Sequence, residues 1–461
     1  MRLKKVLTLR TVVATSAGLT LATSSFVAAV QVAGFLAGDA AWLAILIGGL
    51  LCLTAGACFA ELHSLFPSAA GIRLYFGRAF GDRLALTVSL LYMLIIMGVV
   101  GAESYVLASI LNAAWPVIPP IVWITVMLVT VTFLNIRGVR VAGNFQDVIT
   151  YGLMLATVAL ALIGLGKVDF QLNAPLHTGG AISLINAVAV GVFLFVGFEW
   201  VTPLAEEVKD QRTVARGMLI AVGLLSVVYA LITVAMTANL PKDSLVSSPY
   251  PQLIFARHVL GPYGVAVIVL ISLASSITTF NAGLISVSRF FYAAAREHVL
   301  PSVFSRISMR FLTPWAAIIM VFVVGLVISY LVLFSGRYLW LVNMAAATEA
   351  LVYALAGLAV LILRRHLPGT RGFNAGNFLL PATTTLAFAI LAAAVLFTYP
   401  TVAIGMGVGL IMTSIYVRTV VPWLKQKHRL RQQARKKRRP ASLGVSEAVS
   451  AVSQVAGKKQ Q

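Results

Sequence analysis

Residues 193–217 read FLFVGFEWVTPLAEEVKDQRTVARG, which sets Gly197 and Glu199 inside a strongly apolar run. A carboxylate in a membrane-length segment is costly unless it faces protein or water, so by default it indicates a functional path. The polar loop that follows carries acids and bases together. The rest of the chain decides what kind of path this is.

The composition indicates an integral membrane protein. Of 461 residues, 60% are hydrophobic and only 11% are charged, and the mean hydropathy is +0.94. Soluble domains carry about a quarter of charged residues. The apolar run after MRLKKVLTLR continues to about Ala37, too long for the core of a signal peptide, so it predicts a retained transmembrane helix.

Apolar stretches of about 20 residues, the length that crosses a bilayer core, recur along the chain. They lie near residues 12–37, 42–66, 84–113, 118–136, 145–167, 181–204, 215–240, 263–293, 315–335, 340–363, 378–399 and 401–423. The sequence therefore predicts an all-α integral membrane protein with twelve transmembrane helices.

The distribution of basic residues agrees with this count. All but four of the 35 Lys and Arg residues fall in the termini or in alternate connections; the exceptions are Lys167, Lys242, Arg257 and Arg337. By the positive-inside rule, both termini are expected in the cytoplasm and the protein in the plasma or inner membrane. The net charge of +21 is thus mostly a topological signal, and it gives little support to nucleic-acid binding.

Two polar ends flank the predicted transmembrane domain of residues 12–423. Residues 1–11 form a short cytoplasmic N-terminus, and residues 424–461 a basic tail that includes KQKHRLRQQARKKRRP. We expect this tail to be disordered and solvated; contact with anionic headgroups is the alternative.

The predicted topology places Gly197 and Glu199 well inside the membrane. Glycine weakens the helix, and a break there exposes main-chain groups that can bind a ligand where backbone lines a cavity. Close helix packing is the alternative explanation of Gly197 alone. Glu199, two residues further on, favours a binding site.

Three stretches together resemble the amino acid, polyamine and organocation permeases over most of the chain. GFEWVTPLAEEVKDQRTVARG is similar to the family's sixth-span signature, although Gln211 and Ala215 stand where the family usually has prolines. AELHSLFPSAAGIRLYFGRAFG at 60–81 is similar to the link between spans 2 and 3. FNAGLISVSRFFYAAAREHVLPSVFSRISMRFLTP at 280–314 is similar to span 8 and its following loop.

The resemblance implies a LeuT-like fold with a 5+5 inverted repeat. Repeat one would cover about residues 12–167 and repeat two about 181–363, with two extra C-terminal helices at about 378–423. Broken spans 1 and 6 would meet around a site near the membrane midplane.

The resemblance also implies the substrate-binding residues. In span 1 the matching stretch is ATSSFVAAV, which lacks the family's usual glycines. In span 6 the resemblance implies an aromatic gate at Phe193 or Phe195, and backbone contacts around the substrate amine. The residues concerned are Thr23, Ser24, Ser25, Phe26, Phe193, Phe195, Val196, Gly197, Phe198 and Glu199. Without the family, the hydroxyls of span 1 would simply bond the preceding turn and the phenylalanines would be packing residues.

Further polar residues lie inside other spans. In the family Glu103 of span 3 would face the substrate's side chain, Tyr92 would lie near the gates, and an acid such as Glu199 helps couple gating to protonation or occupancy. Glu349 is a third buried acid; if the three faced one cavity they would favour a cationic substrate, and otherwise they would bond neighbouring helices. Ser275 and Ser276 on span 8 could contribute to a cation site, or only to helix–helix hydrogen bonds.

A second group of acids lies at the predicted cytoplasmic surface. Glu61 ends span 2, and Glu206 and Glu207 follow span 6. We expect these acids to form ion pairs that latch helices together; the nearby bases in the sequence are Arg73, Arg78, Lys209 and Arg216.

These features favour a secondary active transporter that moves amino acids or related amines, including cationic amino acids or polyamines, by alternating access. No enzyme motif, metal-ligand cluster or cofactor motif is evident, and H⁺ or Na⁺ is the expected coupling ion. The expected partners are a small-molecule substrate and the lipid bilayer, not nucleic acid. A substrate sensor or accessory subunit that keeps the permease fold is the alternative. Symport, exchange and oligomeric state stay open.

Overall fold

The structure, a computed structural model, describes residues 5–22, 40–168, 180–241, 251–367 and 373–438. These ranges are helical apart from their connections and one isolated β-bridge between Leu7 and Val208. Within them, eleven helical segments are long and apolar enough to cross a membrane. The first predicted span lies only partly in the described residues, because residues 23–39 are outside them.

The helices of the first half follow the predicted spans closely. They are α1 (Leu9–Thr20), α3 (Ala41–Leu65), α4 (Ile72–Phe80), α5 (Asp82–Ala114), α6 (Pro120–Arg137) and α7 (Val139–Leu165). The short α4 was not predicted, and α7 begins at Val139 rather than near 145. Gly138, at φ +138°, separates α6 from α7, so the two helices follow one another with almost no loop.

The second half continues in the same way. Its elements are α8 (Gly180–Phe193), η3 (Phe198–Glu206), α9 (Arg212–Asn239), α11 (Pro251–Leu260), η4 (Gly261–Tyr263), α12 (Gly264–Arg296), η5 (Ser302–Ser305), α13 (Trp315–Ser335), α14 (Tyr338–His366), α15 (Leu379–Thr398) and α16 (Pro400–Arg438). The predicted sixth span, 181–204, is thus an α-helix followed by a separate 3-10 helix.

The centre of the bundle is α1, whose residues Thr11–Thr20 are all buried. It contacts α7, α9, α12 and η3. Glycines permit close approach at these contacts: a Cβ on Gly217 of α9 would come within 2.6 Å of Val12 Cγ1. Small residues in membrane helices serve this purpose generally.

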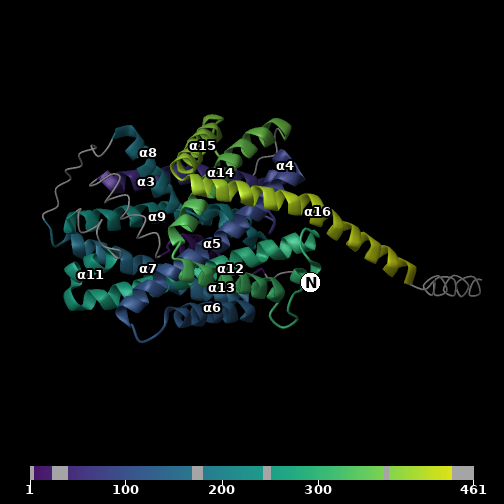
Figure 1. The fold of residues 1–461 in the computed structure, drawn as a ribbon. Helices are drawn as coiled ribbons and strands as arrows, with labels where there is room; N and C mark the ends of the chain where they lie inside the picture. Colours follow the sequence, from purple (N-terminus) through teal and green to yellow (C-terminus); the bar gives the residue numbers. More distant parts are fainter. Residues whose placement is uncertain (1–4, 23–39, 169–179, 242–250, 368–372, 439–461) are drawn as a thin grey trace, which may run out of the picture.

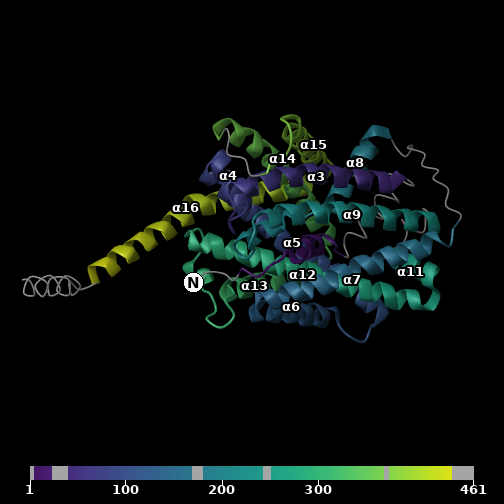
Figure 2. The same cartoon turned by 180° about the vertical axis from the view of Figure 1, so that it is seen from behind.

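The chain begins at the end of the bundle from which the outer half of α16 departs, and α11 lies at the other end (Figures 1 and 2). We call the first of these ends the N-terminal face. The amides of Val6 and Leu7 donate to the Glu207 carbonyl at 2.9 and 3.1 Å, so the start of the chain is fastened to the segment after η3.

Ion pairs between helices gather at this face, as the sequence predicted, but their partners differ. Glu207 pairs with Arg289, both fully buried, and Glu206 with Arg296. Glu61 accepts from Arg364 at 2.6 Å, and Arg73 pairs with Glu297. The expected partners lie close in the sequence, whereas the observed ones come from α12 and α14, which only the packing of the helices brings near.

The basic tail departs from its prediction. Disorder is expected from residue 424, whereas the structure continues α16 to Arg438. No glycine or proline stands between Pro422 and Pro440, and the intervening Lys, Arg, Gln and Leu residues have high helix propensity. The rings of His428 on this helix and His298 stack with centroids 3.5 Å apart, so α16 contacts the loop after α12.

Candidate functional site

The predicted sixth span is interrupted at its middle. After α8, the amides of Leu194, Phe195 and Val196 each bond the carbonyl three residues earlier, at 2.9–3.2 Å, and Gly197 then takes φ +102°. Glycine adopts this left-handed region readily because it has no Cβ. A Cβ there would also come 2.7 Å from Leu19 Cδ2, so the break lies directly against α1.

Hydroxyl groups hold the facing end of α1. Ser275 Oγ donates to the Leu21 carbonyl at 2.6 Å, and the Tyr229 hydroxyl to the Thr20 carbonyl at 2.7 Å. Ser16 Oγ reaches across to the Phe198 carbonyl at 2.8 Å and so ties α1 to the break itself. The last carbonyls of a helix need such outside donors. The predicted site residues Thr23, Ser24, Ser25 and Phe26 lie outside the described residues.

The phenylalanines of the sixth span are all buried. Phe193 is 6% exposed, and Phe195 and Phe198 are 0% exposed. Phe195 meets Tyr229 edge-on at 5.7 Å, and the Phe198 ring lies 5.2 Å from that of Tyr353. Of the two residues predicted as an aromatic gate, Phe193 is buried and Phe195 packs against α9. Phe198, predicted as a backbone contact, packs towards α14. A gating role for any of these rings stays a prediction.

Two of the predicted acids meet directly after the break. The Tyr353 hydroxyl lies 2.8 Å from Glu199 Oε2 and 2.6 Å from Glu349 Oε1, which also accepts from the Gly197 amide at 3.0 Å. Tyr92 donates to Glu199 Oε1. Both carboxyl groups are fully buried. We call Glu199, Glu349, Tyr92 and Tyr353 the carboxyl cluster; it joins η3 to α5 and α14.

The third acid, Glu103, lies apart from this cluster. It is eleven residues beyond Tyr92 on α5, about 16 Å along a helix axis, and it accepts from Ser276 Oγ of α12 at 2.6 Å. The structure thus does not gather the three acids in one cavity. Ser275 and Ser276 both donate hydrogen bonds to neighbouring elements, as in the helix–helix alternative given for them above. Their contribution to a cation site stays a prediction.

Sequence reasoning missed Tyr353, Trp200 and Ser16. Tyr353 follows Glu349 by four residues and shares its helix face, so the spacing alone could have suggested the pair. Trp200 donates through Nε1 to the Tyr92 oxygen at 2.9 Å. Nothing in the sequence indicates that contact or the one made by Ser16, because each joins residues more than a hundred positions apart.

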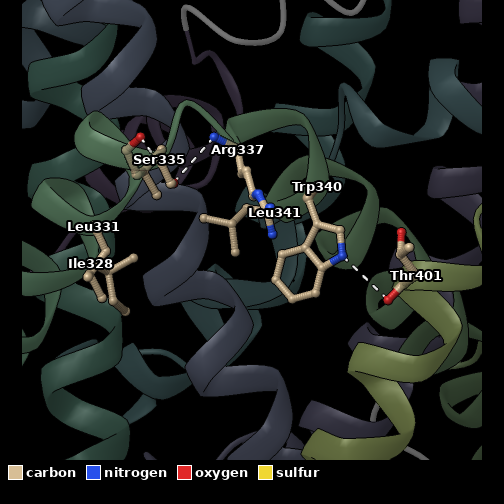
Figure 3. Close-up of a pocket in the computed structure, with 8 residues that line it drawn as sticks. Ile328, Leu331, Ser335, Arg337, Trp340, Leu341 and Thr401 are labelled. Carbon is tan, nitrogen blue, oxygen red and sulfur yellow. Dashed lines mark hydrogen bonds between the residues drawn. The ribbon is translucent and has the colours of Figure 1, made fainter.

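A separate pocket of about 590 Å³ lies away from the break, between the adjoining ends of α13 and α14 and the start of α16. Figure 3 shows Trp340 and Arg337 at this place, with the Trp340 Nε1 directed at the Thr401 carbonyl, 3.4 Å away. Its other lining residues are Ile328, Leu331, Val332, Ser335 and Leu341. None of the predicted site residues lines it.

A bundle of membrane-length helices, with one helix broken beside buried carboxyl groups, is typical of membrane transport proteins. The family model for amino acid permeases matches residues 7–421, and the chain belongs to this family. It is a multi-pass membrane transporter and not an enzyme.

Characterised relatives are distant but cover most of the chain. The methylthioribose transporter of Bacillus subtilis is 25% identical over 76% of this chain and 79% of its own. The human Asc-type amino acid transporter 1 is 26% identical over 82% and 74% of the two chains. The human large neutral amino acids transporter small subunit 2 is 25% identical over 81% and 72%.

A solved structure of a Na⁺-coupled sialic acid symporter, in a substrate-bound outward-open state, shares the fold. The TM-score is 0.54 with 14% sequence identity, covering 85% of this chain and 90% of the symporter. At this identity the likeness concerns the arrangement of helices alone.

Proposed function

We propose that the protein is a secondary transporter that moves an amino acid or a related amine by alternating access. The observation that carries this proposal is the break at Gly197, packed against the end of α1 in the core of the bundle. A broken helix inside the membrane exposes main-chain amides and carbonyls that can bind a ligand where the backbone lines a cavity. The substrate would lie between this break and the span 1 residues Thr23–Phe26.

The finer architecture belongs to the same proposal. Twelve spans with a 5+5 inverted repeat would place α1 and the broken sixth span as equivalent elements of the two halves. The shared fold of the sialic acid symporter supports this arrangement. The charge distribution supports cytoplasmic termini in the cell membrane, so that the N-terminal face would be the cytoplasmic one.

The substrate class follows from relatives and from the acids together. The names of two human relatives specify amino acids. Glu199 and Glu349 already accept hydrogen bonds from tyrosines and from the Gly197 amide, so we do not expect them to bind a polyamine. Glu103, the third of the acids predicted inside the spans, accepts from Ser276 Oγ, and a second amine on the substrate would approach this pair. We therefore favour an amino acid, neutral or carrying a side-chain amine.

Uptake by purified protein in liposomes tests the proposal. Labelled neutral and cationic amino acids, polyamines and methylthioribose are offered in turn, with unlabelled substrate inside to drive exchange. Saturable uptake of an amino acid supports the proposal. Retained ligand binding without uptake or exchange of any compound would instead indicate a sensor or accessory subunit.

The role of Glu103 is tested by Glu103→Gln. If its carboxylate faces a substrate amine, uptake of cationic relative to neutral substrates should fall about tenfold or more, because a charged hydrogen bond contributes about 1.5–3 kcal/mol. Asp82→Asn, exposed at the start of the same helix, is the matched control. An unaltered preference in Glu103→Gln would remove Glu103 from the selectivity argument.

A further inference from the structure

Another pocket, of about 400 Å³, lies between the start of α5 and the middle of α16. It is at the N-terminal face, since α4, which leads into α5, and the outer half of α16 both lie at that end of the bundle (Figures 1 and 2). None of the residues predicted to bind or gate the substrate lines this pocket. We call it the α5–α16 pocket.

The side chains that α16 contributes to this pocket form one stripe, which changes from apolar to basic. Its members recur at intervals of four residues, the spacing of a single helix face; they are Val417, Val421, Lys425 and Arg429. The stripe extends over about 18 Å of the helix axis. On α5, which runs in the opposite direction here, Arg83 comes before Leu86. Both helices therefore place basic side chains at the outer end of the pocket and apolar side chains at its inner end.

Trp423 indicates where this stripe lies relative to the bilayer. It stands in the sequence between the apolar and the basic half of the stripe, and it is 54% exposed. The ammonium group of Lys427 lies 4.6 Å from the centroid of its ring. Tryptophan is enriched at the level of the lipid headgroups. The basic half of the stripe is thus expected among the headgroups, and the apolar half at the depth of the acyl chains.

The basic side chains of the pocket are not neutralised by protein carboxylates. None of the ion pairs between described residues includes Arg83, Lys425 or Arg429. One acid, Asp82, also lines the pocket, but its Oδ1 lies towards α4, 3.3 Å from the position of a Cβ on Gly77. Three positive charges and one negative charge leave the outer end positive, so an anion that enters it is attracted.

Contacts outside the pocket hold α16 in place beside α5. Deeper in the bundle, a Cβ on Gly409 would come 2.6 Å from Leu91 Cδ1, so the two helices touch there. The Tyr416 hydroxyl donates to the Val299 carbonyl at 2.9 Å, and His428 contacts the same loop after α12. The walls of the pocket are therefore positioned without any contact made by its charged lining residues.

We propose that the α5–α16 pocket binds an anionic phospholipid of the leaflet at the N-terminal face. The lipid phosphate accepts hydrogen bonds from Arg83, Lys425 and Arg429, because arginine and lysine are the side chains that bind phosphate most strongly. The acyl chains leave along the apolar half of the stripe into the bilayer. Basic pockets between transmembrane helices on the cytoplasmic side bind such headgroups, and this is the cytoplasmic face in the proposed orientation.

The order of charge and apolar surface favours a lipid over a soluble anion. A phospholipid carries its phosphate outermost and its acyl chains towards the membrane centre, which is the order of the side chains in the pocket. A soluble phosphate would leave the apolar half unused. The volume is in the range of small-molecule pockets and accommodates a headgroup with its glycerol. The bound lipid joins α16 to α5 and so stabilises the folded protein.

The first test measures lipid selectivity by native mass spectrometry. Purified full-length protein in neutral detergent is equilibrated with equal amounts of phosphatidylglycerol and phosphatidylcholine. Wild-type protein should retain phosphatidylglycerol about tenfold or more over phosphatidylcholine, because several basic residues act on one phosphate. The double variant Lys425→Gln/Arg429→Gln should lose this preference, and Arg83→Gln, on the opposite wall, should weaken it.

The matched control is the double variant Arg418→Gln/Lys427→Gln. It removes the same charge from exposed positions of α16 that do not line the pocket, and it should keep the wild-type preference. Equal loss in the two double variants would show a general attraction of the basic helix for anionic lipid and would overturn the pocket. Equal retention of both lipids by wild-type protein would overturn it as well.

Thermal unfolding distinguishes a lipid from a soluble anion. Phosphatidylglycerol should raise the unfolding temperature of wild-type protein and of the control variant, but not that of Lys425→Gln/Arg429→Gln. Glycerol phosphate, which carries the same phosphate without acyl chains, should raise none of them. A rise with glycerol phosphate equal to that with the lipid would make this a soluble-anion site and overturn the proposal. Neither measurement requires transport, so their results leave the proposed function untouched.

Discussion

At the scale of single residues, Gly197 makes the break possible. Its φ of +102° is strained for any residue with a side chain, and the space where a Cβ would stand is filled by Leu19. Its amide is consequently free of the helical ladder and donates to Glu349 instead. One glycine thus sets both the backbone conformation and the contact with α14.

Gly197→Ala should therefore destabilise the protein by about 1–3 kcal/mol, the range for strained backbone at functional sites. Thermal unfolding in detergent measures this, together with substrate exchange in liposomes. Gly223→Ala is the matched control, because Gly223 lies inside α9 and a Cβ added there would meet no atom within 4 Å. Equal stability and exchange in the two variants would contradict the role given to Gly197.

The sequence indicates Gly197 and Glu199 because a glycine and an acid are unusual inside an apolar span. It does not indicate how the acids pair. Glu103 and Glu349 look alike as buried glutamates, yet one bonds Ser276 of α12 and the other bonds Tyr353 and the Gly197 amide. That difference depends on how α14 packs against η3, which no local pattern contains.

At the scale of elements, two ion pairs of very different burial fasten the end of η3 to α12. Glu207 and Arg289 are both 0% exposed, with two hydrogen bonds of 3.2 and 3.3 Å between them. The side chains of Glu206 and Arg296 are 27% and 52% exposed. A buried charge left without its partner costs far more than an exposed one.

Glu207→Gln should accordingly lower the free energy of unfolding by about 3–5 kcal/mol, because it leaves the Arg289 guanidinium buried and unpaired. Glu206→Gln, one residue away, should change it by only about 0–1 kcal/mol. Thermal unfolding of both variants in one detergent provides the comparison. Similar losses of unfolding free energy in the two variants would show that burial does not decide the strength of these ion pairs.

The packing of α16 should depend on pH. Burial, and then His428 and Lys425, lower the pKa of His298, so the packed state favours the neutral ring. The packed state therefore binds fewer protons than the detached one, and packing is lost as pH falls through the ordinary histidine range. Spin labels at Met309→Cys and Gln433→Cys should separate between neutral pH and about pH 5.5. An equal separation in a His298→Asn background would rule out the histidine as its cause.

At the scale of the whole molecule, the charge distribution sets the expected orientation in the membrane. Val117, 92% exposed between α5 and α6, and Met309, 79% exposed after α12, lie on connections assigned to opposite sides. In intact cells a membrane-impermeant maleimide should label Val117→Cys but label Met309→Cys only after permeabilisation. Labelling of Met309→Cys in intact cells, and of Val117→Cys only after permeabilisation, would contradict the expected orientation.

Most of the architecture was predictable because a bilayer imposes its own length and charge rules on a sequence. The boundaries of α13 and α15 differ from the predicted spans by at most one residue. The departures occur where those rules do not apply: α4 and α11 lie in connections, and the helical end of α16 lies beyond the apolar run, where propensity alone decides. The break in the sixth span was predicted from one glycine and from the resemblance, but its 3-10 continuation was not.

Alternating access requires the N-terminal face to open and close around the broken sixth span. We would measure the distance between spin labels at Lys209→Cys, after η3, and Arg78→Cys, on α4, in lipid with Cys52 and Cys58 left in place because both are buried. Two distance populations are expected, with a transported substrate shifting their ratio. A single distribution, the same with and without saturating substrate at neutral and acidic pH, would contradict this motion.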